Sequence, residues 1–187
     1  LALLPQTVAV VDANVGAKIE IPLKVARSTE QIRQSMNTRL TGMEPELAAL
    51  WNFDDLQNPG KDATTNGYHG KLVKGAKTVE IAPEPGAPFS VTRQNKVLDL
   101  DGTDGTYVEL PPNIINHLKN ITVEGWVRWR SFGTWTRFFD FGKAQTGSSV
   151  TQRNRTRGLR LVVLNTRNAD DYTQIPNYEL RPDQWNH

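Results

Sequence analysis

The chain of 187 residues contains no cysteine, which excludes disulfide bonds, cysteine-ligated zinc or iron–sulfur centres and a thiol nucleophile. It contains no apolar run close to the ~20 residues that a membrane-spanning helix needs. Neither sign of charge is in excess, because 22 Lys and Arg stand against 20 Asp and Glu, so we expect no overall field that attracts nucleic acid. The remaining composition, 37% hydrophobic and 22% charged, is typical of an ordinary globular domain.

The ends of the sequence indicate a piece of a longer protein. The chain begins with Leu1, with no positively charged segment leading into an apolar core, and it stops at Trp185-Asn186-His187. We therefore expect both ends to be cut from a longer polypeptide.

Two segments near the N-terminus favour β-strands. Residues 6–11 are rich in β-branched side chains, and residues 17–25 alternate apolar with charged side chains. This period of two predicts a half-buried strand over 17–25, and Pro22, which has no N–H to donate, favours an edge position in the sheet.

A short helix is predicted after this strand. Ser28 and Gln31 have the spacing of a capping box, in which each side chain accepts a hydrogen bond from the other residue's backbone N–H. We expect the helix to end near Asn37. Gly42 and Pro45 then interrupt the chain, so a boundary is predicted there.

After this boundary the sequence is typical of an all-β domain. Short apolar runs alternate with clusters of Gly, Pro, Asn and Asp, and helical periodicity is almost absent. Strands at this spacing predict a sandwich or jelly roll. We expect strands at 48–53, 71–74, 97–100, 106–110, 121–130, 137–141 and 158–164.

The segment 121–130 is predicted to be an inner strand. Its odd-numbered residues form an apolar set with Gly125 at a point of close packing, and Trp126 interrupts the polar set. Both faces are therefore expected to be covered, as in one of two packed sheets. Trp126 and Trp51 are assigned to the core.

An ordered series of short motifs accompanies the predicted strands. They are LAALWNFDD at 47–55, VLDLDG at 97–102, YVEL at 107–110, ITVEGWV at 121–127, FDFG at 139–142 and the final WNH. In this order the motifs resemble a laminin-G-like domain of the concanavalin A-like jelly-roll type. Upstream, residues 24–33 resemble the closing strand and short helix of such a domain.

The resemblance implies an all-β fold, an antiparallel β-sandwich of the jelly-roll type, with one short helix in the N-terminal segment. It divides the chain into residues 1–45, the C-terminal tail of a preceding β module plus a linker, and residues 46–187, a laminin-G-like jelly roll that we expect to be truncated at its C-terminus. The strands that would close this sandwich are expected either beyond the sequence or from a partner.

The function that the resemblance implies is non-catalytic recognition or adhesion, in a secreted or cell-surface protein of several domains. The expected partners are a glycan or an extracellular protein, neighbouring modules of the same polypeptide, and further copies in a homo-oligomer or array; nucleic acid and a membrane span are not expected. The first alternative is a structural subunit of an extracellular array or filament. The second is a glycoside hydrolase, but Glu124 is the sole acid of segment 121–130, and the Glu-x-Asp-x-x-Glu pattern of such enzymes is absent.

Three aromatic residues are candidates for sugar binding. Trp129, Phe132 and Trp135 flank the turn 131–134, and an exposed aromatic face stacks on the apolar face of a pyranose ring. The alternative for Trp135 is burial in the core, the usual position of tryptophan in a sandwich.

The run 153–160 contains four arginines and follows a Gly/Ser loop at 146–149. Arg153, Arg155 and Arg157 are therefore candidates for binding sulfated or acidic glycans. A solvated hairpin with charge pairing between its strands is the commoner explanation of such a run.

Two oxygen-rich loops are candidates for a structural calcium ion. Asp54 and Asp62 lie in one Gly-containing loop and Asp101 lies in another, and hard cations take several carboxylate and carbonyl oxygens from such loops. The resemblance also implies calcium, because related lectin-like domains often hold it near sandwich loops. Hydrogen bonding of these side chains to their own turns is the alternative.

Overall fold

The structure is a computed structural model. It describes residues 18–22, 27–36, 38–45, 47–82, 95–112, 114–115, 121–134, 136–143, 146–152, 155–164, 170–174 and 178–187. The strand predicted at 6–11 and the candidate residues Trp135 and Arg153 lie outside these ranges.

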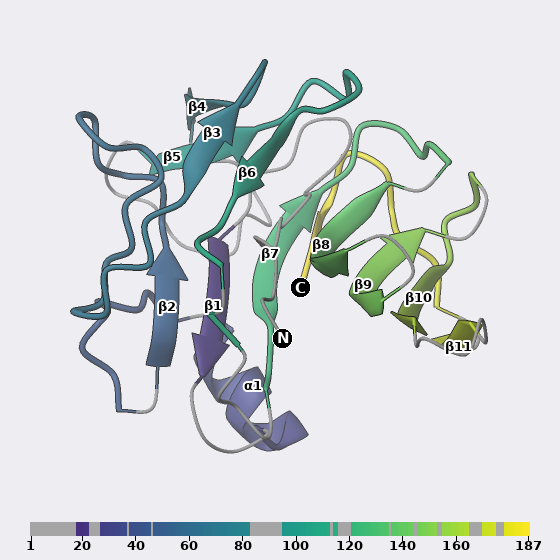
Figure 1. Cartoon of the computed structure of the whole chain (residues 1–187), viewed down its shortest axis with the longest axis horizontal. Helices are drawn as coiled ribbons and strands as arrows, with labels where there is room; N and C mark the ends of the chain where they lie inside the picture. Colours follow the sequence, from purple (N-terminus) through teal and green to yellow (C-terminus); the bar gives the residue numbers. More distant parts are fainter. Residues whose placement is uncertain are drawn as a thin grey trace.

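The described residues form an all-β fold, as predicted, whose paired strands are all antiparallel (Figure 1). One four-stranded sheet has the order β12 (Trp185–Asn186), β7 (Glu124–Arg128), β1 (Lys18–Pro22) and β2 (Leu47–Trp51). The other has the order β11 (Asp170–Gln174), β10 (Leu159–Leu164), β9 (Thr146–Gln152) and β8 (Arg137–Lys143). The described residues also form two two-stranded sheets: β3 (Lys71–Val73) with β6 (Tyr107–Glu109), and β4 (Lys77–Ile81) with β5 (Asn95–Asp99).

Every strand predicted from 46 onward has a counterpart, but β4, β9, β11 and the two-residue β12 are not among the predicted strands. The sequence of β9, TGSSVTQ, is polar, and its first four residues were assigned to a loop. In the structure β9 pairs with β8 on one side and with β10 on the other. A strand position of this kind is decided by the hydrogen-bonding neighbours rather than by the segment's own propensity.

The predicted capping box is confirmed in helix α1 (Thr29–Ser35). The Ser28 hydroxyl accepts from the Gln31 N–H at 3.2 Å, and the Gln31 side-chain oxygen accepts from the Ser28 N–H at 2.7 Å. The helix ends at the C-cap Met36, one residue before the predicted end. No helix in the described ranges is long and apolar enough to cross a membrane.

Strand β1 is an inner strand, which corrects the predicted edge position. Ile21 lies opposite Ala49 of β2, and Ile19 lies opposite Gly125 of β7. Pro22 is the last residue of β1, at the point where the register with β2 shifts, so its missing N–H interrupts no regular pairing. β1, from the part of the chain before residue 46, therefore belongs to the same sheet as strands from the later part, and the division at residues 45–46 stays a prediction.

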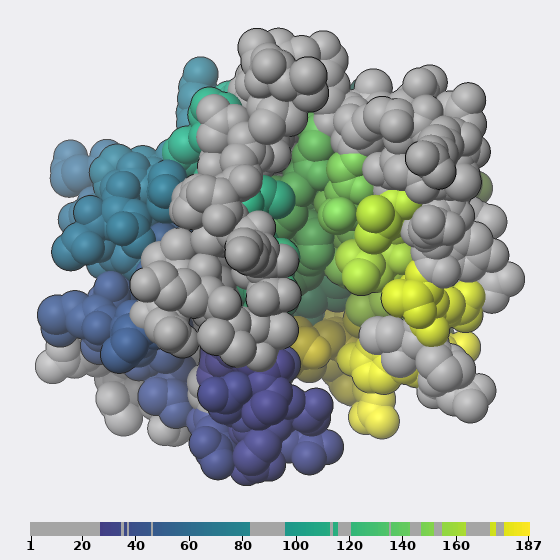
Figure 2. Space-filling model, turned by 60° about the horizontal axis from the view of Figure 1, so that its bottom comes forward, coloured from purple at the N-terminus to yellow at the C-terminus, as the bar shows by residue number. Residues whose placement is uncertain are grey.

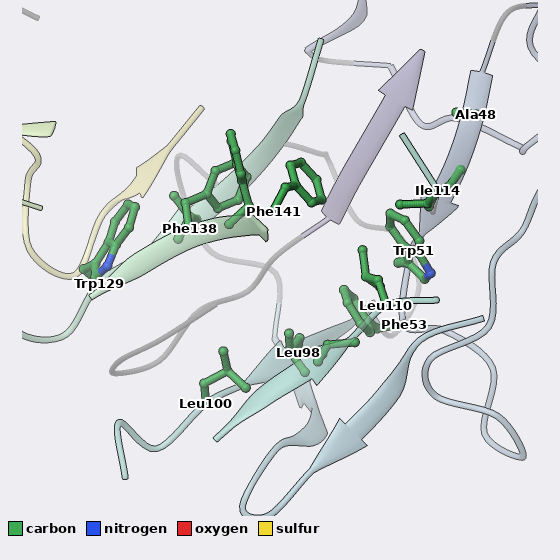
Figure 3. Packing of buried hydrophobic residues seen from close by; sticks show 14 of the residues in the cluster. Ala48, Trp51, Phe53, Leu98, Leu100, Leu110, Ile114, Trp129, Phe138 and Phe141 are labelled. Atoms are coloured by element: carbon green, nitrogen blue, oxygen red, sulfur yellow. The ribbon is translucent and has the colours of Figure 1, made fainter. Parts of the chain in front are cut away.

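The buried apolar side chains form one cluster to which both four-stranded sheets contribute (Figure 3). Trp51 of β2 is buried, as predicted. Burial of such side chains is the main favourable term in a chain that has no cysteine. The strands supply Ala48, Ala49, Trp51, Leu98, Val108, Val127, Phe138, Phe139 and Phe141 to this core.

Candidate binding site

Of the aromatic residues predicted to bind sugar, the structure describes Trp129 and Phe132, and neither of these two is fully exposed. Trp129 is 1% exposed in the core, so its ring faces are not available to a ligand, which corrects that assignment. Trp129 and Val127 are two residues apart and therefore share one face, and Val127 is also buried. Phe132 is partly buried and packs against the same core. Trp135 lies outside the described residues.

Arg155 and Arg157 are exposed in the turn that joins β9 to β10. The antiparallel pairing of these two strands confirms the predicted hairpin. The Nε of Arg155 donates to the hydroxyl of Thr134 at 2.9 Å, whereas Arg157 lines a cleft on the protein surface. The third arginine of the predicted patch, Arg153, lies outside the described residues. Binding of an acidic glycan by this turn stays a prediction.

Asp62, one of the predicted calcium ligands, organises a loop through hydrogen bonds. Its carboxylate is buried and accepts from the backbone N–H groups of Leu50, Thr64 and Tyr68, at 2.9–3.0 Å. The hydroxyl of Thr64 donates a fourth hydrogen bond at 2.8 Å. These four donors compensate the cost of burying the carboxylate.

The other two predicted calcium ligands also have protein partners. Asp54 forms an ion pair with Arg39. Asp101 accepts from the Thr103 N–H at 2.9 Å, and this hydrogen bond holds the pKa of Asp101 below its usual value. Within the described ranges, no group of three or more His, Asp or Glu side chains could hold a metal ion. The calcium ion therefore stays a prediction.

A cleft of about 830 Å³ lies where the C-terminal segment, residues 178–187, meets β7 and the end of α1. Figure 2 shows α1 in purple close to the C-terminal segment in yellow on this side of the molecule. We term it the C-terminal cleft. Its lining residues are Met36, Trp126, Arg157, Tyr178, Glu179, Leu180, Arg181, Gln184, Trp185, Asn186 and His187.

The C-terminal segment is held in place by its backbone and by one buried side chain. Leu180 is 1% exposed, and its N–H donates to the Arg157 carbonyl at 2.8 Å. The Asp183 N–H donates to the Trp129 carbonyl at 2.7 Å, and β12 then pairs with β7. The floor of the cleft is thus fixed to the core by the strand that also contributes Trp126.

The side chain of Asn186 shapes the loop in front of β12. It is 9% exposed, and its amide nitrogen donates to the Gln184 carbonyl at 2.7 Å. Its amide oxygen accepts from the Arg181 N–H at 3.4 Å. These bonds close the turn that carries Arg181 into the cleft wall.

Two tryptophans line the cleft at its strands. The Nε1 of Trp126 donates to the Met36 carbonyl at 2.8 Å, and its ring meets His187 edge-on at 5.1 Å between centroids. The guanidinium of Arg128 lies over the ring of Trp185, 5.4 Å from its centroid. Trp126 is half-buried at a cleft wall, which corrects its assignment to the core.

The cleft has more positive than negative charge. Among the described residues that line it are Arg157 and Arg181, and the one acidic side chain among them is Glu179. Tyr178 is 39% exposed and lies next to this carboxylate in the sequence. The lining therefore combines aromatic rings with guanidinium and amide donors, the combination that suits a polar ligand with apolar faces.

A buried charged group lies beside the cleft. The Glu124 carboxylate has 4% side-chain exposure, and it pairs with Arg27 at 2.8 Å. The Nε2 of His187 is 4.0 Å from the other carboxylate oxygen. Burial, and secondly the positive charge of Arg27, lower the pKa of His187 below its ordinary value of 6.5. The neutral form of His187 therefore predominates at pH 7.

The lowered pKa of His187 predicts a loss of stability in mild acid. The unfolded chain takes up a proton on this residue near pH 6.5, whereas the folded chain does so at lower pH. The contribution of neutral His187 to the free energy of unfolding is therefore present above about pH 6.5, and it is lost as the pH falls toward the pKa of the folded state. We expect the melting temperature to fall less between pH 7 and pH 5 in His187→Gln than in the wild type. Equal slopes in the two proteins would contradict the assignment.

The aromatic residues of the cleft were not predicted from the sequence as site residues. One signal was present, because Trp126 interrupts the polar set of its strand, and a tryptophan at a position expected to face solvent favours a site wall. Trp185 and Tyr178 carried no such signal. They reach the cleft only because β12 pairs with β7 and Leu180 enters the core.

The fold and the cleft define an antiparallel all-β domain with an open site beside its C-terminal strand. Residues 101–187 match the model of a laminin-G family described as the concanavalin A-like lectin/glucanases superfamily. The match confirms the resemblance for that part of the chain, and it suggests a binding module. Searches of curated proteins and of solved structures gave no match.

Proposed function

We propose that this domain is a non-catalytic module that binds a glycan in the C-terminal cleft, outside the cell. The observation that carries the proposal is the lining of the cleft. The aromatic residues Trp126, Tyr178 and Trp185 line the cleft together with Arg157 and Arg181. Aromatic faces bind the apolar faces of sugar rings, and guanidinium groups donate to hydroxyl or carboxylate oxygens.

The size of the cleft supports a small ligand. Its volume of about 830 Å³ lies within the range of pockets that enclose small molecules. An oligosaccharide of a few units would fill such a space, with one or two of its sugar rings in contact with the tryptophan side chains. The excess of arginine over glutamate favours a sugar that carries a carboxylate or sulfate group.

The absence of a carboxylate pair supports recognition rather than hydrolysis. A glycoside hydrolase needs two carboxyl groups about 5–9.5 Å apart, one on each side of the bond that breaks. Among the described residues that line the cleft, Glu179 is the single carboxylate. Glu124, the nearest candidate on β7, is buried and already paired with Arg27.

The test is a titration of the domain with neutral and acidic oligosaccharides, followed by tryptophan fluorescence. We expect binding of an acidic oligosaccharide and a rise in Kd of about tenfold for Tyr178→Ala and for Arg157→Gln, the equivalent of about 1.4 kcal/mol for each lost contact. Both side chains are exposed, so folding should be preserved.

Arg155→Gln is the matched control for Arg157→Gln. Arg155 lies in the same turn, two residues earlier, but does not line the cleft. We expect its loss to leave Kd nearly unchanged. An equal effect of the two substitutions would move the site to the arginine-rich turn, and binding that survives Tyr178→Ala and Arg157→Gln would exclude the cleft.

A further inference from the structure

The position of β1 defines a slot between two strands of the later chain. β1 lies between β2 and β7 and pairs with both, while no direct pairing joins β2 to β7 (Figure 1). All five residues of β2 are buried. Without β1, each of these strands would present an unpaired edge beside buried apolar side chains. An extended segment is therefore needed in the slot to form hydrogen bonds with the facing edges of β2 and β7.

The residues after β1 provide a second, charged contact at the end of the slot. The Arg27 N–H donates to the Thr122 hydroxyl at 3.0 Å, and the Arg27 guanidinium pairs with the buried carboxylate of Glu124 at 2.8 Å. The Met36 carbonyl at the end of α1 accepts from the Nε1 of Trp126 at 2.8 Å. We term β1 and the described residues 27–36 together the N-terminal clasp. The slot thus holds a strand whose chain continues to an arginine that pairs with Glu124.

A tight turn connects the clasp to β2. The Glu44 carboxylate accepts from the N–H groups of Thr41 and Gly42 at 2.8 and 2.9 Å. Gly42 has a φ of +91°, and a Cβ at this position would lie 2.3 Å from the carbonyl oxygen of Ala63. This turn folds the chain back on itself. If it opened, the ten residues 37–46 could extend over about 33 Å, enough to carry the clasp to a neighbouring molecule.

We propose that the clasp is exchangeable, so that the clasp of one chain occupies the slot of a second copy. The occupant in both arrangements is the same segment, with the same strand register and the same Arg27–Glu124 pair. The contacts between clasp and slot therefore contribute equally to the free energy of the closed and of the exchanged arrangement, and they favour neither. The balance between the two arrangements is set by the turn at 41–45 and by protein concentration.

The absence of cysteine from the natural chain permits a direct test by cross-linking. Ile21 and Ala49 are opposite each other across β1 and β2. The single variants Ile21→Cys and Ala49→Cys are mixed at high concentration, incubated and oxidised. Exchange predicts a disulfide-linked dimer of one Ile21→Cys chain and one Ala49→Cys chain, identified by mass after proteolysis. The double variant should cross-link within one chain as well as between chains.

The matched control is a strand pair that does not involve the clasp. Val79 and Val97 are opposite each other across β4 and β5, both on the later side of the turn. A mixture of Val79→Cys and Val97→Cys should give no linked dimer of the two variants. A specific dimer in the first mixture and none in the second supports exchange.

Strain in the turn provides an independent readout. Gly42→Ala places a Cβ against the Ala63 backbone in the closed turn but not in an extended one. We expect this substitution to raise the dimer fraction several-fold in the Ile21→Cys and Ala49→Cys mixture. The proposal is overturned if the double variant cross-links only within one chain and the mixture yields no dimer even with Gly42→Ala. It is equally overturned if the double variant does not cross-link at all, because the register would then be different.

Discussion

Asp62→Ala is expected to lower the free energy of unfolding by about 3–5 kcal/mol. The substitution removes the acceptor of four hydrogen bonds and takes away the partner of the buried N–H of Leu50 and of the partly buried N–H groups of Thr64 and Tyr68. Each buried donor without a partner costs about 1–3 kcal/mol. For a domain of this length the loss corresponds to a decrease in melting temperature of about 10 °C.

The measurement for Asp62 is thermal or urea unfolding followed by circular dichroism. Asp55→Ala is the control, because Asp55 lies in the same loop region but its side chain is 29% exposed and pairs with Lys61 at the surface. Its melting temperature should stay close to that of the wild type. A small effect of Asp62→Ala would show that the loop finds other partners. A wild-type melting temperature that rises in millimolar calcium, with no rise in Asp62→Ala, would assign Asp62 to a metal site instead.

Arg27→Met is expected to destabilise the fold by about 3–5 kcal/mol, because it removes the positive charge that pairs at 2.8 Å with the buried carboxylate of Glu124. Methionine preserves the apolar stem of the arginine, so the loss reports mainly on the charge. The double variant Arg27→Met/Glu124→Gln should be more stable than Arg27→Met alone, since no uncompensated charge remains. Urea unfolding of the two single variants and the double variant measures the coupling between the two side chains.

Arg39→Met provides a control for the charge change in Arg27→Met. Arg39 pairs with Asp54 at the surface, where its side chain is 51% exposed, and exposed ion pairs contribute about 0–1 kcal/mol. We expect a correspondingly small effect. If Arg27→Met and Arg39→Met had equal effects, or if the effects at 27 and 124 were additive, Glu124 would not depend on Arg27 for its charge compensation.

The fold class followed from local patterns. The spacing of Ser28 and Gln31 predicted a helix start that the structure contains. The alternation in 121–130 placed Val127 and Trp129 on one apolar face, and both are in the core. The same alternation should have excluded Trp129 from a surface site, because residues two apart on a strand face the same way. The prediction of a sugar site at Trp129 relied on the aromatic residues that flank the turn at 131–134 and disregarded the period of two in the strand.

The cleft and the slot could not be predicted in the same way. The cleft brings residue 36 together with residues 126, 157 and 178–187. Contacts over such separations depend on which strands pair, and many pairings are compatible with one pattern of apolar residues. Pro22 illustrates the difficulty. Its missing N–H favoured an edge strand, but as the last residue of β1 it is compatible with an inner one.

The sequence by itself determined the class of fold, the capped helix, the core face of the central strand and the absence of any disulfide. These features depend on residues within a few positions of one another, because strand and helix periods and capping hydrogen bonds are local. Only the tertiary structure decided that β1 lies between β2 and β7, that Glu124 finds its counter-charge in Arg27, and that Trp126, Tyr178 and Trp185 line one cleft. These features arise from the pairing of distant strands, which is selected by the burial of the whole core and not by any one segment.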